Sequence, residues 1–417
     1  MDQADIAIVG AGAAGLMAAI HAGRRARELN RPIRIVALDG ARTLGAKILV
    51  AGGGRCNVTH HAVTPDAYAG STRNAIKKVL RRFDVPDTVA FFQALGVELK
   101  REDTGKLFPT TDSARTVLNA LLQGVRDTGA EIHHPRRVET IQPIDHAYTL
   151  AGDWGELTAN RLILATGGMA LPRSGSDGAG YAFAKALGHT VTPRVFPALV
   201  PLIVEPDHFI RHLSGLTLPA RLELRAGTGK RLLSFTNSTL CTHFGLSGPS
   251  TMDLSRYLTS ARHQDRAAHL VIAWLPDATP DQLDADLQAL NKRGVVRWLS
   301  EHLPARLAET LCAQAEIEPQ TLGHALTRDQ RKRLVRLITE CPVPVTGDRG
   351  FTHAETTAGG VPLAEIELGT MTSRVRPNLH LCGEICDVDG RIGGFNFQWA
   401  WASGHIAGLS AADARCR

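Results

Sequence analysis

Apolar and polar positions follow a recognisable order at the start of the chain. Residues 6–9, IAIV, form a strand-like run that leads into the turn GAGAAG, and an alanine-rich pattern typical of a helix follows. A second strand-like run, IRIVAL at 33–38, ends at an acidic residue. In such a unit the glycines let the backbone approach a pyrophosphate, and the acidic residue accepts hydrogen bonds from a ribose. The order predicts dinucleotide binding at Gly10, Gly12, Ala14, Gly15 and Asp39.

Two later apolar runs predict strands that return to the same sheet. RLILATGG at 161–168 closes on Thr166 and Gly167, and NLHLCGE at 378–384 closes on Gly383 and Glu384. Parallel strands present their carboxyl ends at one edge of a sheet, where ligands bind. If the ligand is a flavin, Glu384 is therefore placed to bind a hydroxyl group of its ribityl chain.

A polar turn and a helix follow the last of these strands. The turn ends in a double glycine, and the helix carries many small residues. The start of such a helix aims N–H groups at a ligand and would stabilise the negative charge of a reduced flavin. The predicted contacts here are Asp389, Gly393, Gly394, Phe395, Asn396 and Phe397.

Composition and charge change the picture only slightly. The chain has 417 residues, of which 44% are hydrophobic, so it is long enough for two or three domains. A net charge of +6 mildly favours an anionic ligand or partner. Two basic runs, 74–83 and 328–337, are spaced like the solvated faces of helices and lack the interleaved aromatic residues of a nucleic-acid surface. They leave only weak RNA contact as an expectation.

Targeting and metal signals are missing from the sequence. No apolar window is long enough to span a membrane, and the start of the chain lacks the basic region of a signal peptide, so we expect a cytoplasmic protein that does not contact membranes. The seven cysteines are scattered and lack metal-ligand spacing, which predicts neither disulfides nor a metal site. The segment GTGKR at 227–231 lacks the spacing of a phosphate-binding loop and predicts a hairpin turn.

Several longer motifs extend from end to end of the chain. They include GAKILVAGGGRCNVTH at 45–60, CTHFGLSGPSTMDLS at 241–255 and FTHAETTAGGV at 351–361. With these motifs the chain resembles the BaiN-like (YhiN-like) NAD(P)/FAD-dependent oxidoreductases, also called aminoacetone-oxidase-family FAD-binding enzymes. The resemblance implies FAD, an α/β Rossmann domain of the two-dinucleotide-binding type, and an adenine contact at Val138. It places Lys47, Gly53, Gly54, Arg55, Cys56 and Asn57 along the flavin and pyrophosphate.

Domain organisation follows from these motifs. Residues 1–190 and 345–417 are expected to form the FAD domain, which is interrupted by an insertion. Alternating apolar runs at 191–270, with 335–345, predict a β-rich, barrel-like domain. Helical periodicity at 271–334, with a cap at Thr279, predicts a small helical subdomain.

The candidate chemistry is hydride transfer from flavin N5 to an activated C=C bond, with a protein acid supplying the proton. Cys56 and His243 are the acid candidates. Arg55 and free N–H groups are placed to lower the pKa of Cys56, but the favoured explanation is that Cys56 is a small residue packed under the flavin. His243 either protonates substrate or braces its loop. Arg55 suits phosphate or an anionic flavin, and His60 and His61 are expected to be surface residues rather than covalent flavin attachments.

Three functions remain open at this point. The first is an NAD(P)H-driven reductase of an enone or uracil-type C=C bond, in a small molecule or in RNA. It is supported because the resemblance includes enzymes linked to enone reduction in a steroid-type acid and to uracil reduction in ribosomal RNA. The second is an oxidase of a small amine such as aminoacetone, and the third a non-catalytic FAD-bound RNA-associated module. A second dinucleotide-binding turn is missing from the sequence, so NAD(P)H is expected to dock only transiently.

Overall fold

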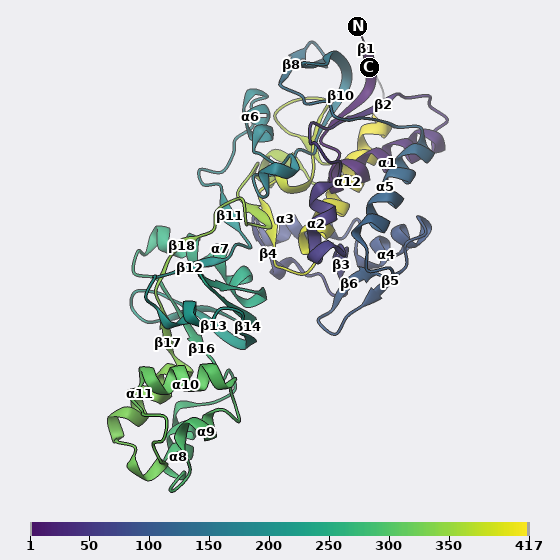
Figure 1. Ribbon diagram of the computed structural model, residues 1–417. Helices are drawn as coiled ribbons and strands as arrows, with labels where there is room; N and C mark the ends of the chain where they lie inside the picture. The colour runs from purple at the N-terminus through teal and green to yellow at the C-terminus, as the bar shows by residue number, and fades with distance from the viewer. Residues whose placement is uncertain (1, 415–417) are drawn as a thin grey trace. The chain divides into compact units, whose positions relative to one another are not determined.

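A computed structural model describes residues 2–414 of the chain. It contains two compact units, Met1–Pro197 with Phe351–Arg417 and Ala198–Gly350. The first unit is thus built from two separate stretches of sequence, and the second from one (Figure 1).

The first unit is organised around a sheet with a parallel centre. Its strand order is β20-β21-β22-β10-β1-β2-β7, and the hairpin β8–β9 continues from β10. The predicted strands are present, but β1 begins at Asp2 rather than at Ile6, because the long strand β10 supplies a ladder for the polar residues as well. The bounds of the parallel strands are β1 Asp2–Val9, β2 Ile35–Leu38, β7 Glu131–His133, β10 Gly155–Leu164 and β22 Leu379–Leu381.

Two helices cross each other closely beside this sheet. The helices are α1, Ala13–Glu28, and α12, Phe395–Asp413 (Figure 1). A Cβ atom on Gly404 would lie 2.5 Å from the carbonyl oxygen of Ala14, and one on Gly408 would lie 2.3 Å from that of Ala18. The small residues of α12 are therefore explained by backbone contact between the two helices.

Shorter elements complete the first unit. The helices are α2 Ala46–Gly54, α3 Arg73–Leu80, α4 Val85–Ala94, α5 Ala114–Thr128 and α6 Ala179–Ala186. The further strands are β3 Thr59–His60, β4 Tyr68–Gly70, β5 Leu99–Arg101, β6 Lys106–Pro109, β8 Thr140–Ile144, β9 Ala147–Gly152, β11 Phe196–Ala198, β19 Thr356–Ala358, β20 Ile366–Glu367, β21 Thr372–Ser373 and β23 Val388–Gly390.

The second unit joins an antiparallel sheet to a group of helices. The sheet has the order β17-β16-β13-β14-β15-β12-β18, and the segment 226–230 forms the predicted hairpin turn between β13 and β14. Its strands are β12 Leu202–Val204, β13 Thr217–Arg225, β14 Arg231–Thr242, β15 Gly245–Ser247, β16 His269–Ala273, β17 Cys341–Val343 and β18 Val345–Asp348. Its helices are α7 Pro249–Gln264, α8 Pro280–Gln288, α9 Val295–Leu299, α10 Ala305–Gln314 and α11 Arg328–Thr339.

The sheet and the helices of the second unit share one hydrophobic cluster. Leu222 of the sheet, Trp298 of α9 and Leu334 of α11 all belong to it. The predicted cap is also present, because the Thr279 side chain accepts a hydrogen bond from the backbone of Gln282 at the start of α8. None of the described helices is long and apolar enough to cross a membrane.

Candidate functional site

The glycine turn after β1 contains two glycines that pack closely against backbone atoms, Gly10 and Gly15, and one with open space beside it, Gly12. A Cβ atom on Gly10 would lie 2.4 Å from the carbonyl oxygen of Ala165, and one on Gly15 would lie 1.8 Å from that of Gly10. A Cβ atom on Gly12 would meet nothing within 4 Å. Gly12 is also the N-cap residue that precedes α1, and no side chain caps the helix there. The turn therefore offers an open backbone and helical N–H groups, the arrangement that binds a pyrophosphate.

Asp39 braces this turn from the end of β2. One carboxylate oxygen accepts a hydrogen bond from the backbone N–H of Ala11 (2.7 Å), and the other accepts one from that of Ala41 (2.8 Å). A carboxylate has about four acceptor positions, so these two bonds still leave room for a ribose diol. The predicted adenine contact, Val138, is 5% exposed and belongs to the core of this unit.

The loop after β10 holds two buried hydroxyl groups without partners. Thr166 Oγ1 and Ser176 Oγ accept and donate no hydrogen bond among the described residues. Gly167, with φ of +74°, lies beside Ser176, since a Cβ atom on it would approach Ser176 Oγ to 2.7 Å. Buried polar groups are nearly always hydrogen-bonded, so this pair is consistent with a polar ligand at the loop.

Thr357 connects this loop to the last strand of the sheet. Its Oγ1 accepts hydrogen bonds from the backbone N–H groups of Met169 (2.8 Å) and Ala170 (3.0 Å). Its own backbone N–H donates to Glu384 Oε1 (2.9 Å), while Glu384 Oε2 pairs with Lys47 Nζ (2.5 Å). Two predicted contact residues, Lys47 and Glu384, are thus brought together. Thr357 lies in the motif FTHAETTAGGV, but the sequence carries no signal for its role.

The start of α12 is fixed to the same region by buried side chains. Trp399 Nε1 donates to the Gly383 carbonyl (3.0 Å), and Trp401 Nε1 donates to the Val58 carbonyl (2.9 Å). Gln398 Oε1 accepts a hydrogen bond from Thr59 Oγ1 (2.7 Å). The sequence suggested none of these bonds, and together they set the position of the helix relative to the glycine loop.

The predicted residues around the α12 N-terminus largely contact one another. The Asn396 amide makes two hydrogen bonds with the backbone of Gly390, and the Phe397 ring stacks on Trp401. Gly394 is the N-cap residue of the helix, with φ of +93°, and no side chain caps the helix there. The remaining predicted positions, Asp389, Gly393 and Phe395, are all buried.

The glycine loop at the end of α2 departs from helical geometry. Gly52, Gly53 and Gly54 have φ of +58°, +69° and +86°, which suits glycine. A Cβ atom on Gly53 would meet nothing within 4 Å, and nearby Asn57 has a buried Oδ1 without a partner among the described residues. An open backbone beside an unpaired amide is what a flavin or a pyrophosphate would need.

Arg55 is bound to the protein itself. Its Nη1 lies 2.6 Å from Glu102 Oε1 and 3.6 Å from Asp112 Oδ1. The guanidinium carbon also lies 4.0 Å from the centre of the Phe108 ring. Arg55 therefore joins the glycine loop to β5 and β6, contacts that its sequence neighbours did not indicate.

The less favoured explanation of Cys56, a thiol whose pKa Arg55 lowers, is wrong. The Cys56 side chain is buried, with 0% of the residue exposed, and this burial raises the pKa of the thiol to about 12. Cys56 also has φ of +62°, a conformation that few non-glycine residues adopt. The structure thus places Cys56 as a buried neutral thiol.

The two histidines after the glycine loop differ from each other. His61 is exposed as expected, whereas His60 is half-buried and stacks on Phe395, with 5.1 Å between the ring centres. Burial lowers the pKa of His60. His60 is therefore a partly exposed residue whose ring packs against the first residue of α12.

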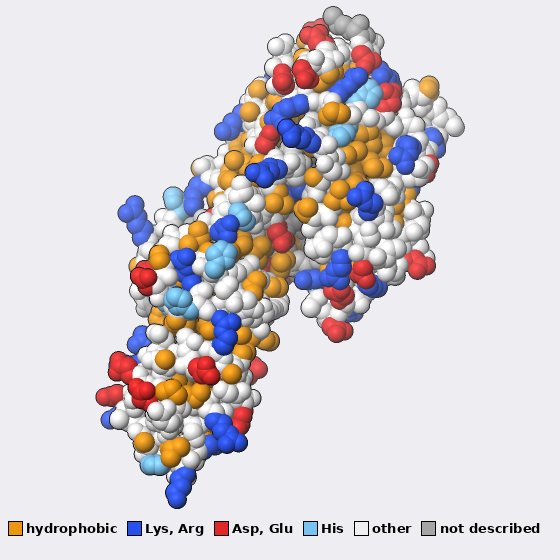
Figure 2. Space-filling view, in the orientation of Figure 1, with side chains coloured by type: hydrophobic (Ala, Val, Ile, Leu, Met, Phe, Trp, Pro, Cys, Tyr) orange, Lys and Arg blue, Asp and Glu red, His pale blue; other side chains and the backbone are white. Residues whose placement is uncertain are grey.

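His243 lies in the second unit. It occupies the two-residue turn between β14 and β15 and is exposed, while its carbonyl oxygen accepts a hydrogen bond from Arg211 Nε (2.7 Å). The helix α11 of the same unit carries one of the basic runs, but Arg331 pairs with Asp284 (2.7 Å) and Arg333 with Glu316 (2.5 Å). Figure 2 shows side chains of both signs mixed over these helices. The basic run is therefore partly neutralised.

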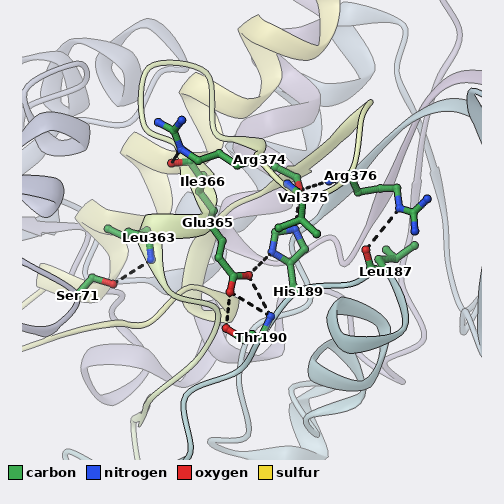
Figure 3. Close-up of polar contacts among 11 residues, drawn as sticks. Ser71, Leu187, His189, Thr190, Leu363, Glu365, Ile366, Arg374, Val375 and Arg376 are labelled. Atoms are coloured by element: carbon green, nitrogen blue, oxygen red, sulfur yellow. Dashed lines mark hydrogen bonds and ion pairs between the residues drawn. The ribbon is translucent and has the colours of Figure 1, made fainter.

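A separate polar cluster fixes the segment that follows β19 (Figure 3). His189 Nδ1 lies 2.7 Å from Glu365 Oε2, and its Nε2 lies 2.7 Å from Ser373 Oγ. The order resembles that of a serine nucleophile with its base and acid. However, Ser373 Oγ already accepts hydrogen bonds from the backbone N–H groups of Val375 (3.0 Å) and Arg376 (2.8 Å). Its acceptor positions are filled, so the cluster acts as a structural clamp.

Metal binding has no basis in the described residues. Among them, no group of three or more His, Cys, Asp or Glu side chains is arranged to hold a metal ion. The six cysteines at 56, 241, 312, 341, 382 and 386 are free and buried, and Cys416 lies outside the described residues.

A family model described as "HI0933-like protein Rossmann domain" matches residues 4–410. This chain belongs to the HI0933-like family. Family members are FAD-dependent oxidoreductases, and the family match agrees with the resemblance predicted from the motifs. The α/β Rossmann fold with its FAD-type domain is likewise confirmed.

Two characterised relatives are similar over nearly the whole chain. A 3-dehydro-bile acid delta(4,6)-reductase of Clostridium scindens is 32% identical over 98% of this chain and 99% of its own length. A ribosomal RNA dihydrouridine synthase of Escherichia coli is 31% identical over 97% of this chain and 96% of its own.

Solved structures give the same fold. A 3-ketosteroid delta1-dehydrogenase of Sterolibacterium denitrificans has a TM-score of 0.52 at 12% identity and covers 99% of this chain and all of its own. The residues of the first unit fit FAD, because open backbone at Gly12 and Gly53 occurs together with buried groups on Asn57, Thr166 and Ser176 that have no partner in the described part of the chain.

Proposed function

We propose that this protein is an NAD(P)H-driven, FAD-dependent reductase of a C=C bond conjugated to a carbonyl group. The observation that carries the proposal is the pair of relatives, at 32% and 31% identity, with different substrates. One is named as a reductase of an unsaturated bile acid, and the other makes dihydrouridine, which differs from uridine by two hydrogens across the 5,6 double bond. Both reactions add hydride and a proton to a polarised alkene.

The first unit supplies the residues that would hold the cofactor. Gly12 and the start of α1 suit the pyrophosphate, Asp39 the adenosine ribose, and the Lys47–Glu384 pair the ribityl chain. The uncapped start of α12 suits the pyrimidine edge, where its partial positive charge stabilises a negative one. FAD supplies hydride transfer when it is bound. The missing second dinucleotide-binding turn in the sequence favours transient docking of NAD(P)H.

His243 is the better candidate for the proton donor. A donor must reach substrate, and His243 is exposed whereas Cys56 is fully buried with a raised pKa. Burial in the hydrophobic cluster of the first unit supports the other explanation of Cys56, a small residue packed under the flavin. We propose a cytoplasmic enzyme whose substrate is uracil in RNA or an enone of a small acid.

Anaerobic stopped-flow measurements test this proposal. The FAD-loaded protein is mixed with NADPH or NADH while the visible flavin absorbance is followed, and the reduced protein is then mixed with an enone steroid acid, with RNA lacking dihydrouridine, or with air. We expect fast reduction by one nicotinamide and reoxidation by one of the two alkenes. Reduction by aminoacetone instead, with hydrogen peroxide formed on adding air, would show an amine oxidase. Inertness toward every reductant and amine would leave a non-catalytic flavoprotein.

A further inference from the structure

The start of α12 lies against the strands β3 and β6. A Cβ atom on Gly394, the N-cap residue, would lie 2.7 Å from backbone atoms of Thr59. A Cβ atom on Gly393 would lie 3.7 Å from Cδ2 of His60 and 3.8 Å from Cε of Lys106. His60 and Lys106 are opposite each other in the pairing of the two strands. Since Cε is the carbon atom that carries the ammonium group, the charged end of Lys106 lies beside the start of α12.

Lys106 brings a positive charge to this place, and the protein does not neutralise it. The ammonium group makes no hydrogen bond or ion pair in the described part of the chain, and the residue is only partly exposed. By contrast, two other cations of this region are paired, Arg55 with Glu102 and Lys100 with Asp112. Lys106 therefore keeps its N–H donors for a ligand.

The helix start adds further positive character. The first turn of α12 contains no acidic residue, and no side chain caps it. The unpaired N–H groups at a helix N-terminus act as roughly half a positive charge. His60 supplies no counter-charge, since its ring nitrogens lie 3.0 and 3.1 Å from the carbonyl oxygens of Ala62 and Thr104, and burial lowers its pKa. An ammonium group beside a helix N-terminus is unfavourable by itself, and an anion at this place stabilises both.

Asn57 gives an independent sign of a ligand along the same segment. It lies two residues before Thr59, which contacts Gly394. Asn57 is 7% exposed, and its buried Oδ1 has no partner among the described residues. Because buried polar groups are nearly always hydrogen-bonded, a polar ligand is expected here for a reason that does not involve Lys106.

We propose that Lys106 is a further residue of the flavin site, where its ammonium group stabilises the negative charge of the reduced flavin. The inference rests on the proposed function, in which the pyrimidine edge of the flavin lies at the start of α12. Two electrons and one proton convert the neutral oxidised ring system into a reduced one with a negative charge at this edge. Lys106 therefore binds reduced FAD more tightly than oxidised FAD, and this difference raises the reduction potential.

Redox titration tests this role without substrate or nicotinamide. The FAD-loaded full chain is reduced with dithionite under anaerobic conditions in the presence of a reference dye, and the flavin absorbance gives the reduction potential. The dissociation constant of oxidised FAD is measured separately by flavin fluorescence. Lys106→Met removes the charge and keeps the length of the side chain, whereas Lys106→Arg keeps the charge. Lys100→Met in β5 is the matched control, because Lys100 is already paired with Asp112.

We expect Lys106→Met to lower the affinity for reduced FAD, relative to that for oxidised FAD, about tenfold, as the loss of a charged hydrogen bond would. For a two-electron couple this change corresponds to a reduction potential lower by about 30 mV. Lys106→Arg should restore most of the potential, and Lys100→Met should have the potential of the parent protein.

An unchanged potential in Lys106→Met, in a protein that still binds FAD, would overturn this role. An equal decrease in Lys100→Met would also overturn it, because any nearby charge would then have the same effect. If Lys106→Met binds no FAD, the arginine variant decides. Recovery of FAD binding and of the potential supports the role of the charge, and failure of both variants to bind FAD assigns Lys106 to the fold and overturns the proposal.

Failure of the proposed function gives a different result. A lowered potential in Lys106→Met would establish the role of the lysine even if the parent protein reduces neither alkene, and only the reductase assignment would then be lost. Conversely, an unchanged potential in a variant of an active reductase would remove only the lysine from the flavin site.

Discussion

Lys47 Nζ lies 2.5 Å from Glu384 Oε2, although the two residues are 337 positions apart in the chain. Both side chains are largely buried, with 26% and 19% exposed. The second oxygen of Glu384 accepts the backbone N–H of Thr357. One carboxylate thus connects α2, β19 and the end of β22, and the region proposed for the ribityl chain depends on it.

Glu384→Gln should weaken FAD binding. The substitution removes the charge that holds Lys47, and hydrogen bonds to charged groups contribute about 1.5–3 kcal/mol, so we expect the FAD dissociation constant to rise about tenfold or more. Titration of the apoprotein with FAD, followed by flavin fluorescence, measures this. Glu131→Gln is the control, since it breaks an ion pair with Arg34 at the amino end of β7. Equal effects of the two substitutions would contradict the role given to Glu384.

Thr357→Val should loosen the loop after β10. Valine keeps the shape but leaves the backbone N–H groups of Met169 and Ala170 without an acceptor, and a buried unpaired group costs about 1–3 kcal/mol. We expect a lower melting temperature and faster release of FAD on dilution. Thr357→Ser keeps the oxygen and should restore both properties. A serine variant as impaired as the valine variant would show that the methyl group, and not the hydroxyl, is what matters.

Cys56 should resist thiol reagents in the folded protein. Its burial and its raised pKa of about 12 leave almost no thiolate at pH 8. Labelling with a disulfide reagent, followed by peptide mapping, measures this in a Cys416→Ser background. We expect labelling of Cys56 only after unfolding. Fast labelling of the native protein would instead support the reactive thiol predicted from the sequence.

His243→Gln should impair the proposed reduction far more than Cys56→Ser does. General acid catalysis contributes roughly 100-fold to 10,000-fold, so we expect a decrease in that range in the rate of reoxidation by substrate. Reduction of the flavin by NAD(P)H needs no protein acid at the alkene and should change little. The two half-reactions, measured separately by stopped flow, give this comparison. Equal decreases in both half-reactions would point to a general disturbance of the enzyme.

Stability should fall in mild acid because of a histidine pair between α1 and α12. The rings of His21 and His405 lie 4.2 Å apart, beside Phe83 and Phe91. Burial lowers the pKa of His21 well below its usual value and lowers that of His405 to about 4.

The sign of the effect follows from these shifts. The unfolded chain takes up protons near pH 6.5 and the folded chain does not, so stability is complete above pH 6.5 and is lost as the pH falls toward 4. Each histidine contributes a slope of up to about 1.4 kcal/mol per pH unit. Thermal unfolding from pH 8 to pH 4 measures the slope, and His405→Phe should flatten it. If the dependence of stability on pH is unchanged in that variant, another buried histidine, such as His380, is responsible for the acid sensitivity.

Local signals in the sequence account for much of the fold and part of the site. The spacing of Gly10, Gly12 and Gly15 between apolar runs is a short-range pattern, and it predicts the turn between β1 and α1 correctly. The hairpin turn at 227–231 and the cap at Thr279 are local in the same way. Each depends on a few adjacent residues whose backbone preferences dominate.

Long-range contacts could not be read from the sequence. Arg55 was interpreted from its neighbours as an anion-binding residue, but its contacts come from Glu102 and Phe108 in the hairpin of β5 and β6. The pKa of Cys56 was assigned from the adjacent charge, and burial by distant residues decided it. Thr357 is a further example, because the two backbone N–H groups that donate to its hydroxyl group belong to residues 187 and 188 positions away in the chain.

The position of α12 at the end of the chain affects when the proposed cofactor region can be completed during translation. Glu384, Asn396, Trp399 and Trp401 are all translated after the other residues of the proposed cofactor region. A nascent chain can form β1, β2 and β10 early, but at that stage Gly383 and the start of α12 have not yet been made. The second unit, Ala198–Gly350, is also translated before Gly383 and α12. Capture of the cofactor therefore comes late, after the ribosome has completed the whole of the second unit.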